Sequence, residues 1–160
     1  MEEGKVLQTQ KMYENMDLKR AKRMLKEGGF TCVLCHKDAI FTSRERGVKP
    51  LLSLLEEKEE VAGFFAADKV VGKAAAFLYV LLGVKAVYAL VISKKAAEVL
   101  KHYGIAYEAD IMVEAVRNRT NTGYCPMEEA VSEIEEAGEA LSAIKEKLHE
   151  LQKNRLSAGV

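Results

Sequence analysis

The sequence predicts an α/β protein in which a largely parallel sheet is covered by short helices. Two apolar runs, residues 61–67 and 84–92, have the length and composition of strands that are buried on both faces. Between them, residues 74–84 are apolar on every side, which is typical of a helix inside a core. Strands that alternate with helices in this way are joined by right-handed parallel crossovers.

Composition favours a single cytoplasmic domain. The chain has 160 residues, 49% of them hydrophobic, which is enough for one domain with a substantial core. The 24 Lys and Arg residues balance 24 Asp and Glu residues, so no net charge attracts nucleic acid or an anionic membrane. We find no signal-peptide pattern, no apolar run long enough to cross a bilayer, and three cysteines, an odd number that suits a reducing compartment.

Local patterns predict the order of the elements. Residues 1–15 are polar and are expected to form a flexible lead-in to an α/β domain over residues 16–124. The expected elements before the first buried strand are a helix from Asp17 to Gly28, a hairpin of residues 31–36 and 39–42, and a helix that begins near Pro50. Those after the central helix are the strand 84–92, a helix from Lys94 to Tyr103 and a strand over 105–109. Residues 110–119 fit either a longer strand or a helical turn.

Residues 125–153 are predicted to form one long amphipathic helix, followed by a disordered tail over residues 154–160. Apolar residues recur there at alternating steps of four and three, which is a narrow heptad seam. The seam consists of Ala130, Ile134, Ala137, Leu141, Ile144, Leu148 and Leu151. It would either dock on the protein's own sheet or pair with a second copy, so a homodimer through this helix is one expectation.

The junction between the first buried strand and the central helix is the leading candidate site. Asp68 is expected at the end of that strand, and Gly72 and Lys73 at the start of the helix. The N–H groups of a helix start, together with a lysine, favour an anion, and ligands of open α/β sheets bind at this edge. An ion pair between Lys73 and Asp68 is the alternative.

The cysteines offer two patterns with different consequences. Cys32 and Cys35 match a haem-attachment or redox spacing, but residues three apart on a strand point to opposite faces, so we expect two buried thiols instead. Cys125 precedes a proline at a helix start, with Glu128 in the capping-box position. A thiol at such a place could act as a nucleophile. Capping is the alternative.

Two polar segments could clamp a phosphate or carboxylate group. Ser43 and Arg46 lie in the loop before the Pro50 helix, and Asn118 and Arg119 lie shortly before Cys125.

Three segments together resemble an uncharacterised prokaryotic family in the cytidine deaminase-like superfamily. They are residues 43–51, residues 68–76, and the pair Asn118 and Arg119 with residues 125–128, and the resemblance covers roughly residues 17–135. It implies a three-layer α/β/α sandwich around a five-stranded mixed sheet. The long C-terminal helix would be added to that sandwich.

The same resemblance argues against zinc chemistry. Zinc deaminases place His/Cys-x-Glu at one helix start and Pro-Cys-x-x-Cys at the next. The corresponding starts here, residues 44–49 and 72–76, contain no such ligand set. The resemblance therefore implies a zinc-free member of this fold, with a site in the corresponding place.

The sequence as a whole predicts a protein that binds a small anionic ligand, such as a nucleotide-like one, at helix N-termini. Lys73 would bind the anion and Asp68 would orient that lysine. The expected ligand-binding residues are Ser43, Arg46, Gly72, Lys73, Asn118, Arg119 and Glu128. A hydrolase or transferase that uses Cys125 with Lys73 or Glu128, and an interaction module that uses the C-terminal helix, are the alternatives. No metal or cofactor is expected.

Overall fold

The computed structural model describes residues 16–118, 123 and 125–158, with side chains up to residue 155. The predicted lead-in over residues 1–15 and the predicted ligand-binding residue Arg119 lie outside this part of the chain.

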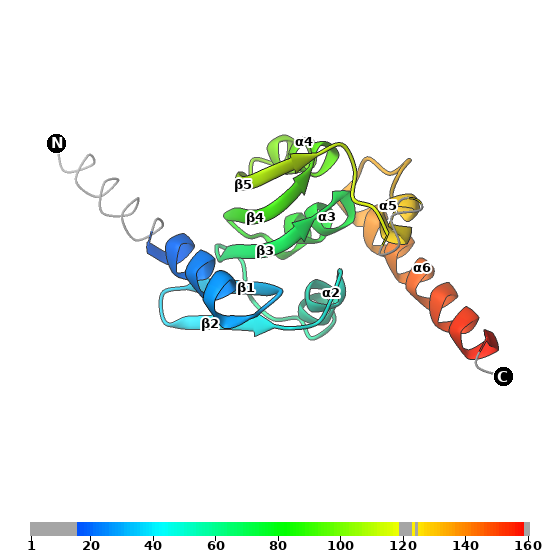
Figure 1. Cartoon of the computed structure of the whole chain (residues 1–160), viewed down its shortest axis with the longest axis horizontal. Helices are drawn as coiled ribbons and strands as arrows, with labels where there is room; N and C mark the ends of the chain where they lie inside the picture. The colour runs from blue at the N-terminus through cyan, green and yellow to red at the C-terminus, as the bar shows by residue number, and fades with distance from the viewer. Residues whose placement is uncertain (1–15, 119–122, 124, 159–160) are drawn as a thin grey trace.

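Five strands form one mixed sheet in the order β2-β1-β3-β4-β5 (Figure 1). The strands are β1 (Cys32–His36), β2 (Ala39–Ser43), β3 (Phe65–Val71), β4 (Ala86–Ser93) and β5 (Ala106–Val113). β1 pairs antiparallel with both β2 and β3, whereas β3, β4 and β5 run parallel to one another. The predicted five-stranded mixed sheet, with its hairpin and its parallel crossovers, is thereby confirmed.

Helices cover both faces of the sheet, which gives three layers. The helix over residues 16–28 packs on one face through Ala21 and Leu25, against a small core that includes Val33 and Tyr88. The helices of the other side are α2 (Lys49–Glu56), α3 (Lys73–Leu82), α4 (Lys94–His102), α5 (Pro126–Ala130) and α6 (Ala137–Ala158). They enclose the larger core around α3.

Cys32 and Cys35 point to opposite faces of the sheet, as predicted. Cys32 belongs to the larger core and Cys35 to the smaller one. Burial raises the pKa of both thiols, and neither forms a disulfide. These two cysteines are therefore core residues.

β3 begins and ends later than predicted, so Asp68 lies inside the strand and not at its end. Gly63 adopts a φ of +81°, in the turn that precedes the strand. Asp68 pairs in the sheet with Cys32 on β1 and Ala89 on β4. Its carboxyl group tolerates this buried position because the Tyr79 hydroxyl of α3 donates a hydrogen bond to Oδ2 at 2.7 Å.

The predicted C-terminal helix is two helices. α5 ends at Ala130 and α6 begins at Ala137, with a fully buried Val131 between them. The N–H of Ala137 donates to the hydroxyl of Tyr103 at 3.2 Å, so the end of α4 helps to fix the start of α6. α6 continues to Ala158, and residues 154–158 of the predicted tail are therefore helical. β5 likewise runs on to Val113, so the ambiguous residues 110–113 extend the strand.

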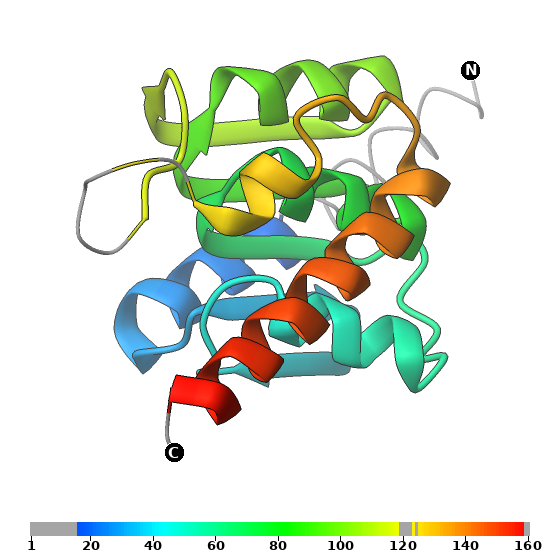
Figure 2. The same ribbon diagram turned by 90° about the vertical axis from the view of Figure 1, so that its right-hand side faces the viewer.

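α6 docks on the domain's own helices. It contacts α3 and crosses the domain diagonally in Figure 2. Ala137, Ala140 and Ile144 are buried, while Leu148 and Leu151 are half-buried against the same core. Much of the heptad seam is thus used within the chain, and the homodimer stays a prediction. In the described part of the chain, no helix combines the length and apolarity needed to span a membrane.

Candidate functional site

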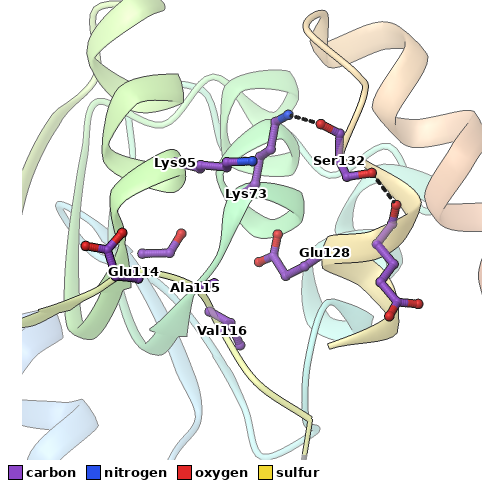
Figure 3. Close-up of a pocket in the computed structure, with 9 residues that line it drawn as sticks. Lys73, Lys95, Glu114, Ala115, Val116, Glu128 and Ser132 are labelled. Atoms are coloured by element: carbon purple, nitrogen blue, oxygen red, sulfur yellow. Dashed lines mark hydrogen bonds between the residues drawn. The ribbon is translucent and has the colours of Figure 1, made fainter. Parts of the chain in front are cut away.

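The residues that follow the three parallel strands converge at one edge of the sheet. Lys73 follows β3, Lys95 follows β4 and Glu114 follows β5, and all three line a cavity of about 480 Å³ (Figure 3). We call it the strand-end cavity. Its other lining residues are Ser93, Ala115, Val116, Glu128, Glu129 and Ser132. Ligands of open α/β sheets bind at this edge.

The ammonium group of Lys73 lies in the strand-end cavity and binds the protein itself. Its Nζ donates to the carbonyl oxygen of Ser132 at 3.2 Å (Figure 3). Partial burial and the neighbouring charge of Lys95 lower the pKa of Lys73, and the carboxylate of Glu128 opposes that shift. The alternative ion pair with Asp68 is absent from the described residues, since Asp68 bonds with Tyr79 instead.

Glu128 occupies the N-terminus of α3. Gly72 is the N-cap of that helix, and the N–H groups of Lys73 and Ala74 donate to the Glu128 carboxylate. Burial raises the pKa of Glu128, and these two N–H groups and Lys73 lower it. The predicted capping box is therefore wrong, because Cys125 makes no side-chain cap on α5 and Glu128 turns to another helix. The anion expected at this helix start is one of the chain's own carboxylates.

A second cavity, of about 700 Å³, lies among the loop between β2 and α2, the start of α5 and the C-terminal half of α6. We call it the basic groove because Arg46, Lys49, Arg117 and Arg155 line it, with Glu45 as the one carboxylate among its lining residues from the described chain. Its other lining residues are Gly47, Val48, Asn118, Cys125, Pro126, Met127, Leu148, Leu151 and Gln152.

The predicted site residues divide between these two cavities. Lys73 and Glu128 line the strand-end cavity, whereas Arg46, Asn118 and Cys125 line the basic groove. α5 supplies residues to both, so it stands between them. Neither of these two cavities is lined by both Cys125 and Lys73.

Asp68, Gly72 and Ser43 line neither of these cavities. Asp68 is 8% exposed and belongs to a buried chain in which the Tyr79 hydroxyl also lies 3.3 Å from Sγ of Cys32. Burial raises the pKa of Asp68 to about 7, although the Tyr79 hydroxyl and two backbone N–H groups act in the opposite direction. Asp68 is thus a core residue, and its predicted role of orienting Lys73 is not supported by its contacts. Ser43 shapes the following loop, because its Oγ accepts from the N–H of Glu45 at 3.1 Å.

Several lining residues were not predicted from the sequence, and Lys95 and Arg155 are two of them. Lys95 could have been found, because it follows a parallel strand in the same way as Lys73 does. Arg155 falls in the predicted tail, and no local pattern reveals it because its position depends on how α6 crosses the domain.

The described residues do not fit a zinc site. No three His, Cys, Asp or Glu side chains in this part of the chain come together as a group that could hold a metal. A catalytic zinc requires three protein ligands. The N-caps of α2 and α3 are Val48 and Gly72, and neither has a metal-binding side chain.

The layers and the sheet order define a small α/β/α sandwich protein. One charged cavity lies beside the ends of its parallel strands, and a second lies among the β2–α2 loop, α5 and α6. Residues 20–148 match a family described as TM1506, a domain of unknown function (DUF1893). This match covers most of the chain, and the chain belongs to that family.

A solved structure agrees with the family. The crystal structure of a DUF1893 family protein (TM1506) from Thermotoga maritima is 27% identical, with a TM-score of 0.76 over 82% of this chain and 89% of that chain. A diaminohydroxyphosphoribosylaminopyrimidine deaminase/5-amino-6-(5-phosphoribosylamino)uracil reductase from Thermotoga maritima is 17% identical, with a TM-score of 0.40 over 61% of this chain and 36% of that chain. That score is too low to support a conclusion about activity. No curated protein matches the sequence.

Proposed function

We propose that this protein binds a small anionic ligand in the basic groove. The observation that carries the proposal is the excess of basic side chains in the described lining of the groove, where Arg46, Lys49 and Arg155 stand beside one carboxylate, Glu45. Guanidinium groups are suited to phosphate and carboxylate because they donate two parallel hydrogen bonds. The cavity of about 700 Å³ also lies within the usual range of small-molecule sites.

The proposed position differs from the helix N-terminus that the sequence favoured. At the start of α3, the Glu128 carboxylate already accepts the N–H groups that an anion would use. A ligand there would have to displace a half-buried carboxylate before it could bind. The basic groove instead combines Arg46 and Asn118, two of the predicted ligand-binding residues, with further cations.

A polynucleotide is a poorer candidate than a small molecule. The whole chain has equal numbers of basic and acidic residues. Binding of a long polyanion relies on many phosphate contacts along a track, whereas these cations are gathered around one cavity.

The alternative hydrolase or transferase receives less support from the geometry. Cys125 lines the basic groove, but Lys73 lines the other cavity and donates to Ser132. Glu128 accepts hydrogen bonds from α3. Neither of the residues assigned to move protons for Cys125 lines the groove with it.

Calorimetric titration tests the proposal. Inorganic phosphate, nucleoside monophosphates and small dicarboxylates would be titrated into the protein at low ionic strength. At least one should bind, and Arg46→Gln should weaken it about tenfold, the loss expected for one charge-assisted hydrogen bond. Lys101→Gln, an exposed charge on α4 away from the groove, is the matched control and should leave affinity unchanged. No binding across the panel, or equal loss in both variants, would contradict the proposal.

A further inference from the structure

The basic groove has an apolar floor beneath its charged rim. Val48 and Met127 are 7% and 8% exposed, and the half-buried Leu148 and Leu151 of α6 pack against the same core. All four line the groove. The rim is different, because Arg46, Lys49 and Arg155 are exposed. The basic groove therefore offers a ligand an apolar surface at its floor and a charged surface at its rim.

From this division we infer that the ligand is amphipathic, with an anionic group joined to an apolar or aromatic body about the size of a nucleobase. The inference rests on the proposed function and narrows it. An inorganic anion would satisfy the cations of the rim but would leave the floor in contact with water. A ligand that also covers Leu148 and Leu151 gains the free energy of removing apolar surface from water.

The size and construction of the groove support this ligand class. A cavity of about 700 Å³ is far larger than a phosphate ion and is typical of ligands with an organic body. Met127 adds a flexible and polarizable side chain to the floor, which can adapt to a flat ring. The floor comes from the N-cap residue of α2, from α5 and from α6, so a ligand that covers it would bridge three segments of the chain.

Inorganic phosphate and a series of phosphate monoesters test the rim and the floor separately, because the phosphate group stays the same while the organic group changes. Inorganic phosphate, methyl phosphate, phenyl phosphate and 1-naphthyl phosphate would be titrated into the full chain by calorimetry. We expect the aryl esters to bind about tenfold more tightly than methyl phosphate, since each buried methylene-sized unit contributes several-fold in affinity.

Two substitutions then test whether the apolar body of the ligand contacts the floor and its anionic group contacts the rim. Leu151→Asn should weaken the aryl esters about tenfold and leave inorganic phosphate unchanged, whereas Arg46→Gln should weaken every ester. Leu141→Asn is the matched control, because Leu141 is a half-buried α6 residue that packs on the core without lining the groove. Thermal unfolding of each variant shows that it is folded at the temperature of titration.

The outcomes distinguish this inference from the proposed function. If phosphate binds and Arg46→Gln weakens it, but the aryl group adds no affinity, the inference is overturned and the proposed function stands. If the aryl esters bind equally well to Leu151→Asn, the floor is not their site and the inference is also overturned. If no anion binds, both are overturned.

Discussion

The carboxylate of Glu128, on α5, lies over Gly72 at the start of α3. A Cβ built on Gly72 would collide with Oε1 of Glu128 and would lie 3.1 Å from Cγ2 of Val116. Gly72 has a φ of −97°, which any residue can adopt, so this position requires a glycine for space and not for backbone freedom. The pair ties the short helix α5 to the central helix of the fold.

Gly72→Ala should therefore lower the free energy of unfolding by about 1–3 kcal/mol, the usual cost of forcing a methyl group into a packed contact. In a Glu128→Ala background the same substitution should cost much less, because the colliding carboxylate is gone. Urea denaturation of the four proteins of this cycle gives the coupling.

Gly138→Ala is the matched control for that prediction. A Cβ at Gly138 meets no atom within 4 Å, and alanine is the better helix former. Its free energy of unfolding should not fall, and the better helix propensity of alanine should raise it by up to about 1 kcal/mol. Equal losses for Gly72→Ala and Gly138→Ala would contradict the steric role of Glu128.

Asp68 should make the protein less stable as the pH rises. Its pKa of about 7 in the folded state exceeds the ordinary value of 3.8, so the folded state holds this proton more tightly than the unfolded state does. The contribution of this tighter proton binding to the free energy of unfolding is fully present below pH 3.8 and is lost as the pH rises through 7. The shift corresponds to about 4 kcal/mol.

Asp68→Asn should remove this loss, because the amide cannot ionise. The difference in free energy of unfolding between variant and wild type should therefore shift in favour of the variant by about 4 kcal/mol between pH 4 and pH 8. Urea titrations at the two pH values measure it, and comparison with the wild type cancels other groups such as Glu128. Parallel pH profiles for the two proteins would show that Asp68 is not the group responsible.

Local sequence patterns predict much of this fold because the physical causes are themselves local. The hairpin of β1 and β2, the proline at the start of α2 and the apolar α3 could each be predicted from a short stretch. The same holds for α4, where the Ser93 side chain accepts from the N–H of Ala96.

The errors arise where a distant residue decides the structure. Asp68 lies inside a buried strand, where Tyr79 of α3 donates a hydrogen bond to it. α6 begins at Ala137, whose N–H donates to Tyr103, the residue that follows α4. The residue types of the site were predicted, but their grouping was not. Lys73 and Cys125 both stand at helix starts, yet Lys73 lines the strand-end cavity and Cys125 lines the basic groove.

The three thiols should differ in reactivity. Cys32 and Cys35 are buried and their pKa values are raised, so few of their thiolates form near neutral pH, while Cys125 is half-buried beside the basic groove. Ellman's reagent should modify Cys125 alone in the native protein and all three thiols after unfolding. Native Cys125→Ser should not react. Rapid native modification of Cys35 would mean that the smaller core opens readily.

The packing of α6 on the core can be distinguished by experiment from pairing of α6 with a second copy of the chain. Ile144 is fully buried against the core, so Ile144→Ala should lower the free energy of unfolding by about 2–4 kcal/mol, the usual cost of a cavity at a core position. Lys145→Ala, at an exposed position of the same helix, should have little effect.

If the heptad seam packs only within its own chain, the urea midpoint of the wild type should not change over a roughly 50-fold range of protein concentration. A midpoint that rises with concentration, and a sedimentation coefficient that rises with it, would instead support the homodimer, because mass action stabilises only an associated state.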